Sequence, residues 1–399
     1  MTADLAGRTL DAWLDAHGDE LVAIRRQIHT HPELSGEEHR TTELVAQRLA
    51  AVGLVPRILT SGTGLICDLG EGDGPVVALR ADLDALAMDD EKTTEPRSSR
   101  PGVAHACGHD VHTAVVLGAG LHLAERWPAG GCRLRLLFQP AEEQLQGGAL
   151  DVIADGGLDD VAAVYGLHCE PKLPTGVIGL RTGPITSATD SLTIELTGPG
   201  GHTARPELTV DLTHLVGRII TELPDRVRDL LGARTPLKLV FGSVHTGAAP
   251  NVIPSRAVLH AVARTTDTEV WTRLPGAVEE ALAAIVTDER ATLEVSHTRG
   301  VPPVVNDAGA IDVAAAAVGR AFGDGARVEA PQSWGGDDFS WYTQQVPGAY
   351  LRLGTHDPSS GRPMLDLHAG HFDVDERAIP IGVRLLVAVV EEQLRRLSA

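Results

Sequence analysis

The first part of the chain alternates between helical and strand-like hydrophobic patterns. Apolar residues recur near its start at mostly three- and four-residue steps, at Leu10, Trp13, Leu14, Leu21, Ile24 and Ile28. This spacing predicts an amphipathic helix rather than a signal peptide. Short apolar runs at 76–79 and 134–138 predict strands, and 113–127 predicts a helix between them. Such alternation is typical of an α/β sheet.

The same alternation returns towards the C-terminus. Apolar runs at 161–166 and 349–353 predict two further strands, 311–322 predicts a helix, and the final stretch predicts a closing helix. We therefore expect residues 1–186 and 299–399 to form one discontinuous α/β domain.

Residues 187–298 follow a different order. Alternating apolar and polar positions predict strands at 191–197, 237–244, 257–264 and 292–297, and helical spacing predicts helices at 208–231 and 268–288. This βαββαβ order is that of the ferredoxin-like split βαβ unit, in which two helices cover one antiparallel sheet. We therefore predict a separate α+β domain at 187–298, inserted into the α/β domain.

The charge balance excludes two classes of partner. The 399 residues carry 54 acidic and 34 basic side chains, a net charge of −20 with neutral histidines. Such an acidic surface repels phosphate backbones and anionic lipid heads, so we expect neither a nucleic-acid nor a membrane partner. No apolar run reaches the ~18 residues that a membrane-spanning helix needs.

The cysteines indicate a reducing environment. There are four, Cys67, Cys107, Cys132 and Cys169, too few and too scattered for a disulfide framework. We therefore expect a cytoplasmic location. A cysteine with a special role is then expected to be a metal ligand or a nucleophile.

Polar side chains cluster in four segments next to predicted strands or helices. These segments supply Cys107, His109, Glu142, Glu143, His168 and His368. Each segment alone is also explained as a helix start, an acidic loop or an ordinary histidine. Because the ligand crevice of an open α/β sheet lies beyond the carboxyl ends of its strands, four such segments together favour a functional site.

The donor types indicate the chemistry of that site. A thiolate, imidazoles and carboxylates, with more than four donors, suggest a two-metal centre rather than a closed structural zinc. Two cations would polarise a carbonyl and lower the pKa of a water, and a free carboxylate beside them would take its proton. This predicts hydrolysis of an amide or a similar acyl bond. A nucleobase deaminase and a serine hydrolase are disfavoured, because the chain has no P-C-x-x-C and no G-x-S-x-G segment.

Eight segments, in chain order, resemble the signature segments of the cocatalytic-metal aminoacylase and carboxypeptidase family. They are RADLDAL (80–86), HACGHD (105–110), FQPAEE (138–143), GLHCEP (166–171), GGHTARP (200–206), APNVIP (249–254), GGDDF (335–339) and LHAGHF (367–372). The branch that they resemble most comprises the hippurate hydrolases and the auxin-conjugate amidohydrolases. The resemblance extends over nearly the whole chain.

The resemblance implies a dinuclear metal centre with a general base beside it. One metal would be held by Cys107, His109 and Glu143 and the other by His168 and His368, with the Cys107 thiolate shared. Glu142 would activate the water, and Asp84 would orient a ligand. Manganese or zinc are the expected metals, and nickel or cobalt also suit these donors.

For the domain at 187–298 the resemblance implies a lid and a homodimerisation surface. His202 would reach the active site of the other subunit and help to stabilise the oxyanion. Asn251 would bind the substrate, and Arg264 would bind the substrate's carboxylate, to which a guanidinium fork is suited.

The chain departs from the family pattern at two places. Asp337 stands where the family commonly has glutamate in Gly-Glu-Asp-Phe, and Ala369 with Gly370 replaces a frequent Ser-Pro pair. The second change affects the loop that carries His368, for which His371 is the alternative ligand.

We expect a metal-dependent amidohydrolase that cleaves N-acyl amino acids into a carboxylic acid and a free amino acid. A dipeptidase or carboxypeptidase with the same dinuclear site is an alternative, because the sequence does not identify the acyl pocket. A catalytically silent metal-binding homologue is another. Glu142 argues against it, since a scaffold needs no spare carboxylate.

Overall fold

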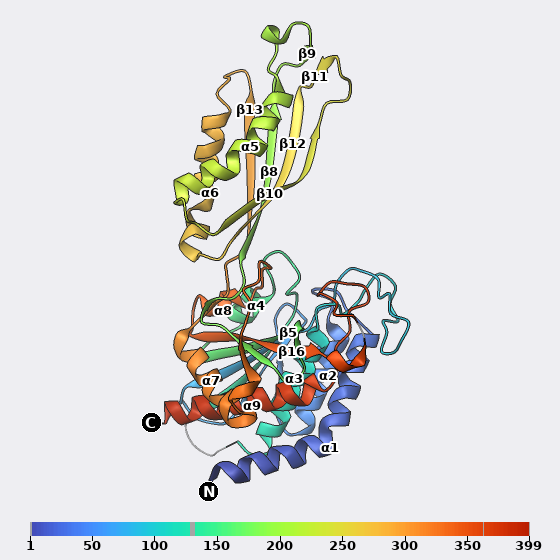
Figure 1. Ribbon diagram of the computed structural model, residues 1–399. Coiled ribbons are helices and arrows are strands. Elements are labelled where there is room, and N and C mark those ends of the chain that lie inside the picture. The colour runs from blue at the N-terminus through green and yellow to red at the C-terminus, as the bar shows by residue number, and fades with distance from the viewer. Residues whose placement is uncertain (1, 128–131, 362, 399) are drawn as a thin grey trace. The chain divides into compact units, whose positions relative to one another are not determined.

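The computed structural model describes residues 2–127, 132–361 and 363–398. The chain forms two compact units, which Figure 1 shows. Unit 1 extends to Ile185 and also includes Val305–Pro331 and the chain from Asp338 onward. Unit 2 comprises Thr186–Val304 and the short segment Gln332–Asp337.

Unit 1 is built on an eight-stranded mixed sheet (Figure 1). Its strands, in spatial order, are β1 (Arg57–Ile58), β2 (Leu65–Leu69), β4 (Arg133–Gln139), β3 (Val76–Asp82), β5 (Val161–Pro174), β16 (Gly348–His356), β6 (Ile178–Leu180) and β15 (Arg327–Glu329). The central β4, β3, β5 and β16 pair in parallel. Side chains on both faces of β3 are buried, as is typical of parallel strands. The predicted α/β sheet is confirmed.

The buried helix α3 (His109–Ala124) packs against several other elements of unit 1. The helices of this unit are α1 (Thr2–Thr30), α2 (His39–Ala51), α3 (His109–Ala124), α4 (Ala149–Ala154), α7 (Ala308–Phe322), α8 (Ser340–Thr343) and α9 (Ala378–Leu397). α3 packs against α1, α9 and β3, and nearly all its side chains are buried. Its first residue, His109, lies against the carbonyl of Asp84, just beyond the end of β3.

Two predicted boundaries near the candidate site were wrong. α3 begins at His109 instead of residue 113. β5 continues to Pro174 instead of ending at 166, because β16 pairs with it through the polar residues, and His168 therefore lies within the strand. Both differences place donor side chains on regular backbone rather than on loops.

Unit 2 is an antiparallel sheet covered by two helices. Its four strands, in spatial order, are β10 (Leu237–Thr246), β12 (Arg256–Thr265), β8 (Ala188–Thr197) and β13 (Thr292–Val301). α5 (Leu212–Leu231) and α6 (Thr268–Ile285) share an apolar core with this sheet. Along β8 buried and partly exposed residues alternate, as expected for a sheet with one covered face. The predicted βαββαβ order is confirmed.

Short elements complete the two units. β7 (Gly183–Pro184) pairs with β14 (Val305–Asn306), and β9 (Gly201–His202) pairs with β11 (Val252–Ile253). Single turns of 3-10 helix lie at η1 (Pro206–Leu208), η2 (Asp324–Ala326) and η3 (Pro358–Ser360). Of the helices that the described residues form, none has the length and apolar character to cross a membrane.

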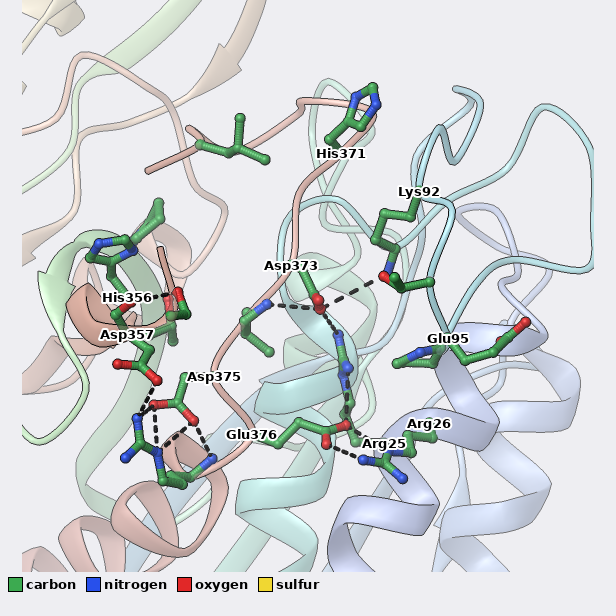
Figure 2. A pocket seen from close by; sticks show the side chains of 18 of the residues that line it. Arg25, Arg26, Lys92, Glu95, His356, Asp357, His371, Asp373, Asp375 and Glu376 are labelled. Carbon is green, nitrogen blue, oxygen red and sulfur yellow. Dashed lines mark hydrogen bonds and ion pairs between the residues drawn. The ribbon is translucent and has the colours of Figure 1, made fainter. Parts of the chain in front are cut away.

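A buried ion cluster ties α1 to the rest of unit 1. The Arg25 guanidinium is fully buried and lies 2.6 Å from Asp110 Oδ2, 3.2 Å from Glu376 Oε1 and 3.6 Å from Asp373 Oδ1. Figure 2 shows Arg25 between the last two carboxylates, with Arg26 on the other side of Glu376. Arg25 therefore joins α1, α3 and the segment that leads into α9.

We expect Arg25→Met to lower the free energy of unfolding of the metal-free protein by about 3 to 5 kcal/mol, because it leaves buried carboxylates uncompensated. Arg26→Met is the matched control. Arg26 pairs with the same Glu376, but its side chain is 57% exposed, so its loss should cost at most about 1 kcal/mol. Urea unfolding followed by circular dichroism measures both, and equal losses would contradict the assignment.

Candidate metal centre

Cys107 and His109 are placed by a tight turn at the start of α3. Gly108 between them has φ +92°, and a Cβ there would lie 2.8 Å from the Cys169 sulfur. Only glycine accepts both this backbone conformation and this close approach. Cys107 and His109 are themselves buried, and burial raises the pKa of the Cys107 thiol well above its usual value. A bound cation would offset that cost by stabilising the thiolate.

The hydrogen bonds of the two buried histidines leave their Nε2 atoms available. His109 Nδ1 donates to the carbonyl oxygen of Asp84 at 2.9 Å, and His168 Nδ1 donates to that of Cys169 at 2.7 Å. His109 Nε2 has no hydrogen-bond partner among the described residues, and His168 Nε2 lies 3.4 Å from Cys107 Sγ. Metal-ligating histidines commonly have their other ring nitrogen fixed in this way.

The charges around these two histidines differ. Burial would lower the pKa of His109, but the neighbouring Asp82 and Cys107 raise it well above its usual value. Burial lowers the pKa of His168 well below its usual value, and the neighbouring His112 and Arg352 lower it further. The two histidines therefore differ in their electrostatic surroundings.

Asp84 holds the acidic loop that follows β4. Its Oδ1 accepts the backbone N–H of Glu142 at 3.1 Å, and its Oδ2 accepts that of Glu143 at 3.0 Å. Ser35 donates a further hydrogen bond of 2.6 Å to Asp84 Oδ2. Both glutamates therefore project towards His109, with carboxylate oxygens 3.8 Å (Glu142) and 3.9 Å (Glu143) from His109 Nε2.

His368 reaches the same cluster from the loop before α9. Its backbone N–H donates to the carbonyl of Ala106 at 2.8 Å, and its Nε2 lies 3.4 Å from Glu143 Oε1. His371 instead lies on the surface, where Nδ1 is 3.0 Å from Glu91 Oε2. Gly370 fits closely against Glu91, whose N–H donates to the Gly370 carbonyl. The departure at Ala369 and Gly370 thus leaves His368 beside the other donors.

Two of the groups of side chains that could hold a cation share Cys107. One contains Cys107, His109 and His168, and the other Cys107, Glu143 and His368, with the ligand atoms of each group within 4.8 Å of one another. The family resemblance implied that His168 and His368 share a metal, whereas here they fall in different groups. Sulfur, imidazole and carboxylate donors around a common thiolate fit two divalent cations.

Sequence reasoning missed a buried support beneath these donors. Asp82 Oδ1 lies 2.6 Å from His112 Nδ1, and His112 Nε2 accepts the N–H of Cys169, the neighbour of His168. Arg80 holds Asp82 and also Asp338 Oδ1, at 2.7 Å. The available signal was the first aspartate of the Asp-x-Asp segment, Asp82, which is the last residue of β3.

Unit 2 brings together two of the three residues predicted there. His202 in β9 pairs with Val252 in β11, and the N–H of Thr203 donates to the Asn251 carbonyl at 3.2 Å. Both His202 and Asn251 are exposed. Arg264 lies near the other end of β12, so it is separate from this pair.

Arg264 is held by one nitrogen of its guanidinium. Nη1 donates to Thr189 Oγ1 at 2.9 Å and to the carbonyl of Trp334 at 2.7 Å. Burial lowers the pKa of Arg264, and no carboxylate within the described residues pairs with it. Among the described residues, the other nitrogens of this guanidinium make no hydrogen bond. The segment 332–337, which contains Asp337, belongs to the same unit.

Several known proteins are similar to this chain. A Rhodococcus jostii protein named glutamate–cysteine ligase 2-3 is 44% identical over 97% of this chain, which spans only 48% of that protein. N-acetyl-L-cysteine deacetylase of Bacillus subtilis is 36% identical (90% of this chain, 85% of the relative). IAA-amino acid hydrolase ILR1-like 4 of Arabidopsis thaliana is 33% identical (96% and 87%).

The fold comparison agrees with these relatives. A dinuclear metal-binding peptidase of Bacillus subtilis from the M20 family superposes with a TM-score of 0.81 at 30% identity, covering 95% of this chain and 99% of that one. The model of peptidase family M20/M25/M40 matches residues 78–392, which include all the candidate donors. The resemblance inferred from the eight segments is confirmed, and the chain belongs to peptidase family M20/M25/M40.

Proposed function

We propose that this protein is a metal-dependent amidohydrolase that cleaves N-acyl amino acids into a carboxylic acid and a free amino acid. The observation that carries the proposal is the convergence of five candidate metal donors with a further carboxylate, that of Glu142, which lies 3.8 Å from His109 Nε2. Relatives named for the hydrolysis of N-acetylcysteine and of an indoleacetyl amino acid conjugate support this substrate class.

The five donors would hold two divalent cations, manganese or zinc first, with nickel or cobalt as alternatives. Cys107, His109 and His168 would hold one cation and Cys107, Glu143 and His368 the other. When bound, such a pair polarises the substrate carbonyl and acidifies a water.

Glu142 would be the general base of the reaction. It would take the proton from the attacking water and give it to the leaving amine nitrogen, so that the amide bond breaks without leaving a charged amide ion. Asp84 would act as a positioning residue, because its carboxylate holds the backbone of Glu142 and Glu143.

Unit 2 would supply substrate binding and dimerisation. Arg264 would bind the carboxylate of the amino acid, Asn251 would hold the substrate, and His202 would act at the site of the other subunit of a homodimer. The domain predicted at 187–298 would serve as the lid. β10 at the edge of the four-stranded sheet has unpaired backbone groups that a second copy could meet. Four free thiols support the proposed cytoplasmic location.

A dipeptidase or carboxypeptidase is the second candidate, because a structural relative is described as a peptidase. The same donors and the same base would serve that reaction. The two candidates differ in the acyl half of the substrate, so substrate tests separate them.

We expect chelator-sensitive release of free amino acid from N-acetyl, N-benzoyl or N-indoleacetyl amino acids after loading with manganese or zinc. Amine release is measured against plain dipeptides under the same conditions. Release from dipeptides alone would favour the peptidase. Release from neither set, with two metals bound per chain, would support the catalytically silent homologue.

Glu142→Gln should lower kcat by about 100- to 10,000-fold while two metals per chain are retained, because the base is lost but not a ligand. Cys107→Ala should instead lose bound metal, since both donor groups share this thiolate. Cys67→Ala, a buried thiol on β2, is the control for cysteine loss and should keep both metals. Turnover and metal content are measured on the same samples, and near-normal turnover of Glu142→Gln would refute its role.

Mixing two inactive variants tests the cross-subunit role of His202. In a mixed dimer of His202→Ala and Glu142→Gln, one site would combine an intact Glu142 with the partner's intact His202. Because half of randomly mixed dimers are mixed and each has one complete site, about a quarter of the parental activity should return. Sedimentation checks that the proteins are dimers. Monomers alone at micromolar concentration, or no return of activity from mixed dimers, would exclude the proposed role.

A further inference from the structure

Arg352 in β16 is a buried cation for which the described residues provide no counter-ion. Its side chain is 5% exposed, and within the described residues it makes no hydrogen bond and no ion pair. Its guanidinium lies over an aromatic ring instead. The guanidinium carbon is 5.1 Å from the centroid of the Tyr350 ring. A guanidinium does not lose its charge in proteins, so burial cannot be relieved by deprotonation.

The other buried arginines of unit 1 behave differently. Arg25 pairs with Asp110 and Glu376, and Arg80 pairs with Asp82 and Asp338. Arg135 binds both oxygens of Asp68, at 2.7 and 2.8 Å. Each of these three therefore has at least one carboxylate, as buried charges normally require. Among the described residues Arg352 departs from this rule, and none of its nitrogens is among the fully enclosed polar atoms that lack a partner. An anion from outside the chain could therefore reach it.

Arg352 lies next to the candidate metal centre. It is the register partner of His168, a proposed ligand, across the parallel pair of β16 and β5. Paired residues of neighbouring strands point to the same face of a sheet. Tyr350 touches both, since its ring centroid is 6.0 Å from that of His168 and Arg352 lies over the same ring. On β16 the alternate residues Leu351 and Leu353 face the apolar core.

We propose that Arg352 binds a second carboxylate of the substrate and makes the enzyme selective for N-acyl amino acids that carry one. This rests on the function proposed above, in which Arg264 takes the first carboxylate. The planar guanidinium matches a carboxylate with two parallel hydrogen bonds. The second carboxylate can come from a dicarboxylic acyl group or from an acidic amino acid side chain, and both sources present the same chemistry to Arg352.

Three substrates and two variants test this proposal. N-acetylmethionine has one carboxylate, N-succinylmethionine adds one on the acyl group, and N-acetylglutamate adds one on the side chain. We expect kcat/KM to be higher for at least one of the last two than for N-acetylmethionine. Arg352→Met should lower kcat/KM for that substrate by about 10- to 100-fold and leave N-acetylmethionine nearly unchanged. Arg352→Lys, which keeps the charge but not the fork, should lie between.

A control and two readouts without turnover separate binding from structure. Arg327→Met removes an exposed guanidinium from β15 and should change none of the three kcat/KM values. Arg352→Met should unfold at the same or a higher temperature than the parent, because it removes an uncompensated buried charge. Calorimetry of the metal-free protein should detect weaker binding of succinate or glutamate, whichever matches the preferred substrate, in Arg352→Met than in the parent.

The outcomes distinguish the two proposals. Cleavage of N-acetylmethionine with no preference for the other substrates, or an equal effect of Arg352→Met on all three, overturns the role of Arg352 and leaves the amidohydrolase intact. A lower unfolding temperature of Arg352→Met with unchanged anion binding assigns Arg352 to structure alone. If none of the three is cleaved, the proposed function fails, and the calorimetry still decides whether Arg352 binds a carboxylate.

Discussion

The carboxylate of Asp84 is the interaction on which the candidate site depends. It accepts the backbone N–H groups of Glu142 and Glu143, while the carbonyl of the same residue fixes the ring of His109. Burial alone would raise the pKa of this carboxyl, but His109, Ser35 and the donated hydrogen bonds keep it below its usual value. An ionised carboxylate that accepts several hydrogen bonds fixes the positions of the groups that donate them. The end of β3, the start of α3 and the loop after β4 therefore meet through one side chain.

Further buried ion pairs near Asp84 support the segments that carry the candidate metal donors. Asp82 lies between Arg80 and His112, and Asp110 lies between Arg25 and His29. Each of these carboxylates is fully buried, and Arg80 beside Asp82 and Arg25 beside Asp110 keep its pKa well below its usual value despite burial. These ion pairs support the segments that carry Cys107 and His109, whereas His109 Nε2 has no hydrogen-bond partner among the described residues.

The sequence predicted the residues that the structure brings together as candidate donors, but not their supports. Cys107, His109, Glu142 and Glu143 could be recognised because several such segments follow one another beside predicted strands and resemble the signature segments of one family. His112 and Asp82 could not, because a histidine and an aspartate in apolar surroundings gain a role only from contacts between β3, α3 and β5. The division of donors between two groups likewise depends on side-chain directions. That Arg352 has no counter-ion among the described residues depends on neighbours from several segments, so no local pattern in the sequence reveals it.

Two of the three described non-glycine residues with positive φ lie in the loops that carry Glu142 and His368, and hydrogen bonds from other segments fix both. Ala141, directly before Glu142, has φ +56°, and His368 has φ +61°. Residues other than glycine rarely adopt this backbone conformation. Such conformations persist only where the surroundings fix them. The Ala141 N–H donates to the buried carboxylate of Glu38 at 2.8 Å, and the His368 N–H donates to the Ala106 carbonyl at the same distance. The loops that carry Glu142 and His368 are therefore shaped by hydrogen bonds from other segments, so substitutions of local turn residues alone would not reproduce this site.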